Sequence, residues 1–241
     1  MLYTPSYQNY ISILRDIKKT GQLSDFENHG DEFIIIRHDI EFDIGKAYQL
    51  ALIEQSENVR STYFVQIESN AYNAFSDSNR EMLSEIIKMG HTVGLHFRQR
   101  EDERENLVAI DKQLQILAEE IPGAKRIFSC HRPKRDTLYH TYRVPDAINA
   151  YAEPFFYRTD RPLEAPTRYI TDSKWQWNNL QEGVNPWMTP RVQFLTHPFQ
   201  WSAKGTSMMR TFDFIDVMHR AELRETFEAE YQKYAEIIRC E

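Results

Sequence analysis

The sequence has few cysteines, no long apolar run and no excess of basic residues. Its two cysteines, Cys130 and Cys240, belong to no CxxC pair, so neither a disulfide framework nor a zinc knuckle is expected. No apolar run approaches the length of a bilayer span, so no membrane-spanning segment is expected. The net charge of −7 argues against a nucleic-acid-binding protein, which needs a basic face.

The N-terminal stretch lacks the basic start and apolar block of a secretory signal peptide, so the expected location is the cytoplasm. Repeats, low-complexity tracts and Pro/Gly-rich linkers are also missing from the sequence, which favours a single domain over residues 1–241. We expect an N-terminal helix and connection over 1–30, the main fold over 31–202 and a C-terminal helix over 212–239.

Short β-branched apolar stretches alternate with segments of helical periodicity. The expected strands are FIIIR, STYFVQ, TVGLHF, RIFSC, AYAEPFFY, RYITD and RVQFLTH. An amphipathic helix is expected from Tyr7 to Ile17, and Asp43 is expected to cap the helix after the first strand. Such alternation predicts a parallel sheet with βα crossovers, and about seven strands in one domain favour a barrel over an open sheet.

Titratable residues gather where the expected strands end. Asp39 and Glu41 follow the first strand, His96 follows the third, His131 the fourth and His197 the last. In a parallel α/β fold the ligand site lies at the carboxyl ends of the strands, so these side chains are expected to meet at one rim.

This set of carboxylates and imidazoles suits zinc or another divalent first-row metal. A bound ion polarises a carbonyl or lowers the pKa of water, a second carboxylate takes a proton, and a histidine returns one to the leaving group. Taken singly, Asp39, His96 and His197 are each better explained as structural residues. Their joint placement after separate strands favours metal-assisted hydrolysis. Other interpretations remain open, such as Arg37 pairing only with Glu41.

The ordered motifs from Phe33 to Trp201 resemble the polysaccharide deacetylase family, which has the NodB homology fold. They are closest to the branch that carries RHD where the main branch has two adjacent aspartates. The motifs are IIIRHDIEFD, RSTYFV, NREMLSEIIKMGHTVGLHF, SCHRP, YITDSKW and FLTHP. The resemblance implies an α/β fold, a distorted, incomplete (β/α) barrel. It also implies removal of acetyl groups from N-acetyl sugars with a divalent metal and an aspartate base.

By position in these motifs, the resemblance implies that Asp39 is the catalytic base and His197 the catalytic acid. It implies that Arg132 orients the base, and that Glu41 and His96 bind the metal.

The sequence departs from the family at one metal ligand, because Arg100 stands where the family usually has a second metal histidine. His131 is the expected third ligand in its place. Glu41 is one methylene longer than the usual Asp of this branch. The resemblance of DSKW to a family motif implies that Asp172 and Trp175 belong to the substrate site, and Arg37 and Arg100 are also expected to bind substrate.

The expected function is hydrolysis of an amide by a zinc-dependent sugar N-deacetylase. Its expected substrate is an N-acetylated, nucleotide- or lipid-linked precursor of a surface polysaccharide. Two alternatives stay open. One is a carbohydrate-binding or scaffolding protein that kept the fold without the activity. The other is a hydrolase of another small amide or imide.

Overall fold

A computed structural model describes residues 4–133, 142–156, 167–177 and 185–239. The chain divides into two compact units, Met1–Gly205 and Thr206–Glu241. The second unit contains one long helix, α6 (Met208–Arg239). No helix in the described ranges combines the length and the apolar character needed to cross a membrane.

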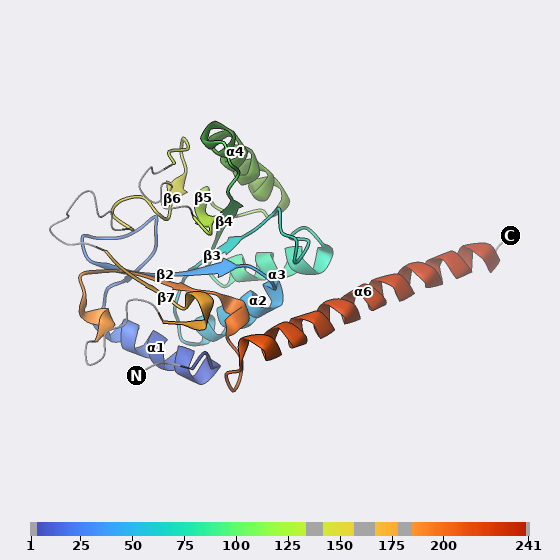
Figure 1. Ribbon diagram of the computed structural model, residues 1–241, viewed down its shortest axis with the longest axis horizontal. Coiled ribbons are helices and arrows are strands. Elements are labelled where there is room, and N and C mark those ends of the chain that lie inside the picture. The colour runs from blue at the N-terminus through green and yellow to red at the C-terminus, as the bar shows by residue number, and fades with distance from the viewer. Residues whose placement is uncertain (1–3, 134–141, 157–166, 178–184, 240–241) are drawn as a thin grey trace. The chain divides into compact units, whose positions relative to one another are not determined.

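One parallel sheet forms the centre of the first unit (Figure 1). Its strands are β1 (Leu23–Ser24), β2 (Phe33–Ile40), β3 (Thr62–Val65), β4 (Thr92–Arg98), β5 (Ile127–His131), β6 (Ile148–Asn149), β7 (Arg168–Thr171) and β8 (Arg191–Thr196). They lie in the order β6-β5-β4-β3-β2-β8-β7, with β1 beside β2. The end strands β6 and β7 do not pair with each other in the described chain. The sheet therefore curls into an incomplete barrel of parallel strands, as predicted.

Four longer helices follow one another around the sheet (Figure 1): α1 (Tyr7–Thr20), α2 (Ile44–Ser56), α3 (Asp77–Lys88) and α4 (Glu103–Glu120). Three short 3-10 helices are η1 (Ser173–Trp175), η2 (Pro186–Met188) and η3 (Pro198–Gln200). The predicted N-terminal helix is confirmed. So is the predicted cap, because the Asp43 side chain accepts a hydrogen bond from the backbone N–H of Lys46 at 3.0 Å.

Strand β2 is buried on both faces, which explains its unbroken apolar start. Because strand side chains alternate, Ile34 and Ile36 face the side covered by α1 and α2 and pack in one cluster with their apolar residues. Phe33 and Ile35 face the inside of the barrel, where they pack with Phe64.

The same alternation sorts the polar residues that end β2. Arg37 and Asp39 continue the inner face, whereas His38 continues the outer face. There, Nδ1 of His38 lies 2.6 Å from Oγ1 of Thr196, and its Nε2 lies 2.9 Å from a carboxylate oxygen of Glu54. His38 therefore ties β2 to both β8 and α2.

Glu54 is completely buried and accepts several hydrogen bonds. Hydroxyl groups donate to it from Ser61 and Tyr63 at 2.6 Å each, and Tyr10 donates as well. Burial raises the pKa of Glu54, but His38 and the other donors outweigh this and lower the pKa to about 2. Glu54 is therefore held as a carboxylate beneath the sheet.

We expect Glu54→Gln to be strongly destabilised, because its amide NH₂ would face hydroxyl donors. The Glu54 pKa falls from 4.5 in the unfolded chain to about 2 in the folded protein, which corresponds to about 3 kcal/mol of stability. That contribution is complete above about pH 4.5 and is lost as pH falls toward 2. Urea unfolding of the wild type and of Glu54→Gln from pH 3 to 7 measures this contribution. The difference between their free energies of unfolding should be largest at pH 7 and should decrease as the pH falls. A constant difference would contradict the prediction.

The predicted strand AYAEPFFY is wrong for residues 150–156, and Tyr157 lies outside the described residues. This segment forms local turns after β6. The N–H of Ala152 donates to the carbonyl of Asn149, and that of Phe155 to the carbonyl of Ala152, each at 2.9 Å. Pro154 has no N–H to give to a sheet. Aromatic composition favoured a strand here, but the backbone hydrogen bonds are satisfied locally.

Candidate active site

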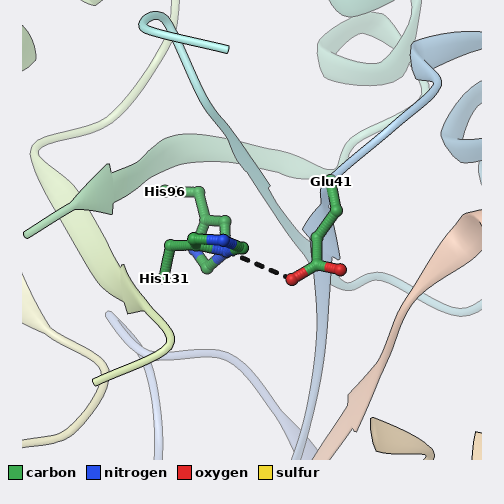
Figure 2. A group of neighbouring side chains, drawn as sticks. All are labelled: Glu41, His96 and His131. Atoms are coloured by element: carbon green, nitrogen blue, oxygen red, sulfur yellow. Dashed lines mark hydrogen bonds and ion pairs between the residues drawn. The ribbon is translucent and has the colours of Figure 1, made fainter. Parts of the chain in front are cut away.

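Three side chains that could hold a metal ion meet at the carboxyl ends of β2, β4 and β5 (Figure 2). Glu41 directly follows β2, His96 lies on β4 and His131 ends β5. Nδ1 of His131 lies 3.1 Å from Oε1 of Glu41 and 3.2 Å from Nε2 of His96. One ligand atom from each residue lies within 4.8 Å of the other two. We call Glu41, His96 and His131 the metal cluster.

Strands β4 and β5 approach closely enough to bring the two histidines together because residue 94 is glycine. A Cβ atom at Gly94 would lie 2.6 Å from both Cγ2 and the carbonyl oxygen of Ile127 on β5. Gly94 is two residues before His96, so both point to the same face of β4. The glycine in GLHF is therefore needed for strand packing beside the cluster.

The donor set fits a divalent first-row ion such as zinc. Burial lowers the pKa of His96 to about 4, so its ring is neutral at pH 7, as a metal ligand must be. Its Nδ1 lies 2.8 Å from Oγ of Ser129, which leaves Nε2 directed at His131 and Glu41. Two imidazole nitrogens and one carboxylate oxygen are typical ligands of catalytic zinc.

Asp39 lies beside the metal cluster and is held by Arg37 from its own strand. Nη2 and Nε of Arg37 donate to the two Asp39 oxygens at 2.8 and 3.2 Å, and Asp39 Oδ2 lies 3.8 Å from Nε2 of His96. Burial raises the pKa of Asp39, but the charge and hydrogen bonds of Arg37, together with the nearby histidines, outweigh burial and lower the pKa to about 2. Asp39 is therefore ionised at neutral pH.

Arg37 is itself fully buried and fixed from several sides. Besides Asp39, it donates to Oε1 of Gln193 at 2.8 Å and to the hydroxyl of Tyr151 at 2.9 Å. Its guanidinium also lies over the Tyr151 ring, 4.6 Å from the centroid. The orientation of Asp39 thus depends on residues from β2, β8 and the turn after β6.

His197 directly follows β8 and is held by Asp172. Its Nδ1 lies 2.7 Å from an Asp172 oxygen, and its backbone N–H donates to the same carboxylate. The Trp201 indole donates to the other Asp172 oxygen at 3.0 Å. The other ring nitrogen, Nε2, lies 3.9 Å from Oε1 of Glu41 in the metal cluster. Burial lowers the pKa of His197, but Asp172 outweighs it and raises the pKa to about 9, so the ring is protonated at neutral pH.

The structure places three predicted residues differently from the sequence interpretation. Arg37 pairs with Asp39, two residues along the same strand face, and not with Glu41, which lies beyond the end of β2. Arg132, predicted to orient Asp39, has an exposed side chain and makes no ion pair with it in the described chain. The carboxylate of Asp172, predicted to bind substrate, is only 3% exposed and is occupied by His197.

Two further predicted substrate-binding residues lie at the edges of the site. Trp175, in η1, is half-buried with its ring 6.1 Å from that of Phe199. Arg100 lies beyond the end of β4, where it pairs with Glu68 at 3.3 Å. It lines a separate pocket against α4 and is not part of the metal cluster.

No protein-family model matches the chain, and no curated protein matches it in sequence. The chain is, however, similar to several solved structures. The chain is similar to a family 4 carbohydrate esterase from Bacillus anthracis, with 16% identity over 89% of this chain and 86% of that one and a TM-score of 0.40. It is similar to a peptidoglycan N-acetylglucosamine deacetylase, with 15% identity over 80% and 83% and a TM-score of 0.42.

A third similar structure is a family 4 carbohydrate esterase pseudoenzyme, also from Bacillus anthracis. It is 13% identical over 79% of this chain and 61% of that one, with a TM-score of 0.40. These proteins are of the kind that the sequence motifs resemble.

Proposed function

We propose that the protein is a metal-dependent amide hydrolase that removes acetyl groups from an N-acetylated sugar. The proposal rests on one observation: an ionised, immobilised carboxylate, Asp39, lies against a three-residue cluster with metal-ligand chemistry. We further propose a nucleotide- or lipid-linked sugar as the substrate, the form in which such precursors occur in the cytoplasm. The half-buried Trp175 ring is the proposed wall of the sugar site.

A divalent ion held by Glu41, His96 and His131 would polarise the amide carbonyl and lower the pKa of the attacking water. Asp39 accepts a proton from that water as its oxygen bonds to the carbonyl carbon. His197 donates its Nε2 proton to the amide nitrogen as the carbon–nitrogen bond breaks. Acetate and a free amine leave the site. Arg37 keeps Asp39 ionised, and Asp172 keeps His197 protonated before each cycle.

We expect the purified protein to contain about one divalent ion per chain, zinc being the favoured metal. His96→Ala should lose most of it, because it removes the buried, neutral imidazole ligand. His29→Ala is the matched control, since His29 is exposed and lies outside the metal cluster. Elemental analysis of proteins purified without chelators measures this. A metal-free wild type, or equal metal content in the two variants, would refute the ligand assignment.

The activity itself is tested by acetate release from a panel of N-acetylated nucleotide sugars, lipid-linked sugars and small N-acetyl amides. Release that a chelator abolishes and added zinc restores would support the proposal. Sugar binding without acetate release would favour the carbohydrate-binding alternative. Acetate release only from small non-sugar amides would support metal-dependent amide hydrolysis but would replace the sugar by a small amide as the substrate.

A further inference from the structure

A pocket with a volume of about 830 Å³ lies against α4 beyond the carboxyl ends of β3 and β4. Its apolar wall includes Ile67 and Phe75 from the segment after β3, and Val108 and Ile116 from α4. None of the residues that line it belongs to the metal cluster. Its volume lies within the range of small-molecule sites, roughly 300–1,000 Å³.

A buried polar side chain without a partner lines this pocket. Gln113, on α4, is 5% exposed, and its amide nitrogen has no hydrogen-bond partner in the described chain. A buried donor without an acceptor is costly and uncommon in folded proteins. A ligand oxygen beside Gln113 would supply the acceptor that its amide lacks.

Three basic residues (Arg100, Arg104 and Lys112) and two acidic ones (Glu68 and Glu105) line the pocket, so its lining is net positive on a chain whose net charge is −7. Arg104 and Lys112 line it from α4 and form no ion pair with any described residue, whereas Arg100 is paired with Glu68. Val108 lies midway between the two unpaired cations at spacings of four residues and is 71% exposed. This face of α4 therefore presents cations on either side of an accessible apolar side chain.

We propose that this pocket binds a small organic anion, a carboxylate or phosphate attached to an apolar chain or ring. Gln113 would donate a hydrogen bond to an anionic oxygen. Arg104 and Lys112 would neutralise its charge. The apolar body would pack on Ile67 and Phe75. The proposal is independent of the proposed deacetylase chemistry, because it uses none of the same side chains.

Calorimetric titration of the whole protein with decanoate and with decyl phosphate tests the proposal, each used below its micelle concentration. At least one should bind, and the tighter of the two identifies the anionic group. Decanol lacks the charge and should bind about tenfold more weakly, because a charged hydrogen bond contributes about that factor. Acetate and inorganic phosphate lack the apolar chain that would be buried, so they should bind more weakly still or not at all. Failure of both amphiphiles to bind, or equal binding of decanol, overturns the proposal.

Variants show whether the binding occurs in this pocket. Gln113→Leu keeps the side-chain size and removes the unpartnered donor, so it should weaken binding about tenfold and raise the melting temperature of the free protein. Lys112→Glu should weaken binding, whereas the same charge reversal at Lys19, an exposed residue on α1, should not. His96→Ala should bind as wild type does, which excludes an anion that merely ligates the metal.

Unchanged affinity in both Gln113→Leu and Lys112→Glu would overturn the proposal, as would loss of binding in His96→Ala. A Gln113→Leu protein that binds less and is also less stable would overturn the role of Gln113. In that case the glutamine would be a structural residue of α4.

Discussion

Replacing Asp39 by asparagine is expected to lower acetate release roughly 10²–10⁴-fold, the contribution of general base catalysis. Asparagine has nearly the same shape, and its one side-chain oxygen can still accept one of the two Arg37 hydrogen bonds, but it cannot take a proton from water. The metal cluster is unchanged, so metal content should stay near that of wild type. Acetate release and metal content, each expressed per folded protein, measure both expectations.

Asp39→Asn is also expected to destabilise the folded protein. Arg37 is fully buried, and Asp39 is its ionic partner in the structure. Asp39→Asn leaves that charge uncompensated, which costs about 3–5 kcal/mol for a buried pair. The double variant Arg37→Gln/Asp39→Asn removes both charges and should recover much of the stability without recovering activity. If this double variant is stable but inactive, the low activity of Asp39→Asn is not caused by unfolding.

Asp43→Asn is the matched control for this pair of variants. Asp43 caps α2, four residues beyond Asp39, and asparagine caps a helix about as well as aspartate. We expect this variant to be as stable and as active as wild type. Undiminished acetate release by Asp39→Asn would instead remove Asp39 from the mechanism and leave it as the buried partner of Arg37.

Much of the fold could be predicted because its strands are buried on both faces. Residues 33–36 form an unbroken apolar run, and that run is the central strand β2. The parallel arrangement then determines that Glu41, His96 and His131 follow their strands at the same edge of the sheet. Turns after β6 were not predictable in this way, since their hydrogen bonds are local and their composition resembles that of a strand.

The residues that hold Arg37 and Asp39 in place were harder to predict than the candidate catalytic and metal-binding residues themselves. The spacing of Arg37 and Asp39 does place them on one face of a strand, but the family resemblance implies Arg132 as the residue that orients Asp39. Gln193 interrupts an apolar strand, and a polar residue at such a position indicates a buried partner. Tyr151 comes from an irregular segment, so no periodicity could place it against Arg37.

The sequence contains a signal for the buried Glu54. It falls three residues after Ala51 and four after Leu50, on the buried stripe of α2. A glutamate on such a stripe requires several donors, and here they come from α1, β2 and β3. The donors lie far apart in sequence, so only the folded arrangement identifies them.

The second large effect concerns the proton that the leaving amine needs. His197→Ala is expected to lower acetate release from an N-acetyl sugar roughly 10²–10⁴-fold. An amine is a poor leaving group unless its nitrogen is protonated, and the Asp172 carboxylate keeps His197 charged for that purpose. The variant should fold, because Asp172 keeps hydrogen bonds from the Trp201 indole and from the backbone N–H of residue 197.

An activated ester separates this role from a merely structural one. 4-Nitrophenyl acetate releases a phenolate that leaves without protonation, so its hydrolysis should depend on Asp39 and the metal cluster but hardly on His197. We therefore expect His197→Ala to lose the amide reaction while retaining most of the ester reaction and its bound metal. Asp39→Asn should lose both reactions. Equal losses on amide and ester in His197→Ala would contradict proton donation, because a histidine that only shaped the site would affect the two substrates alike.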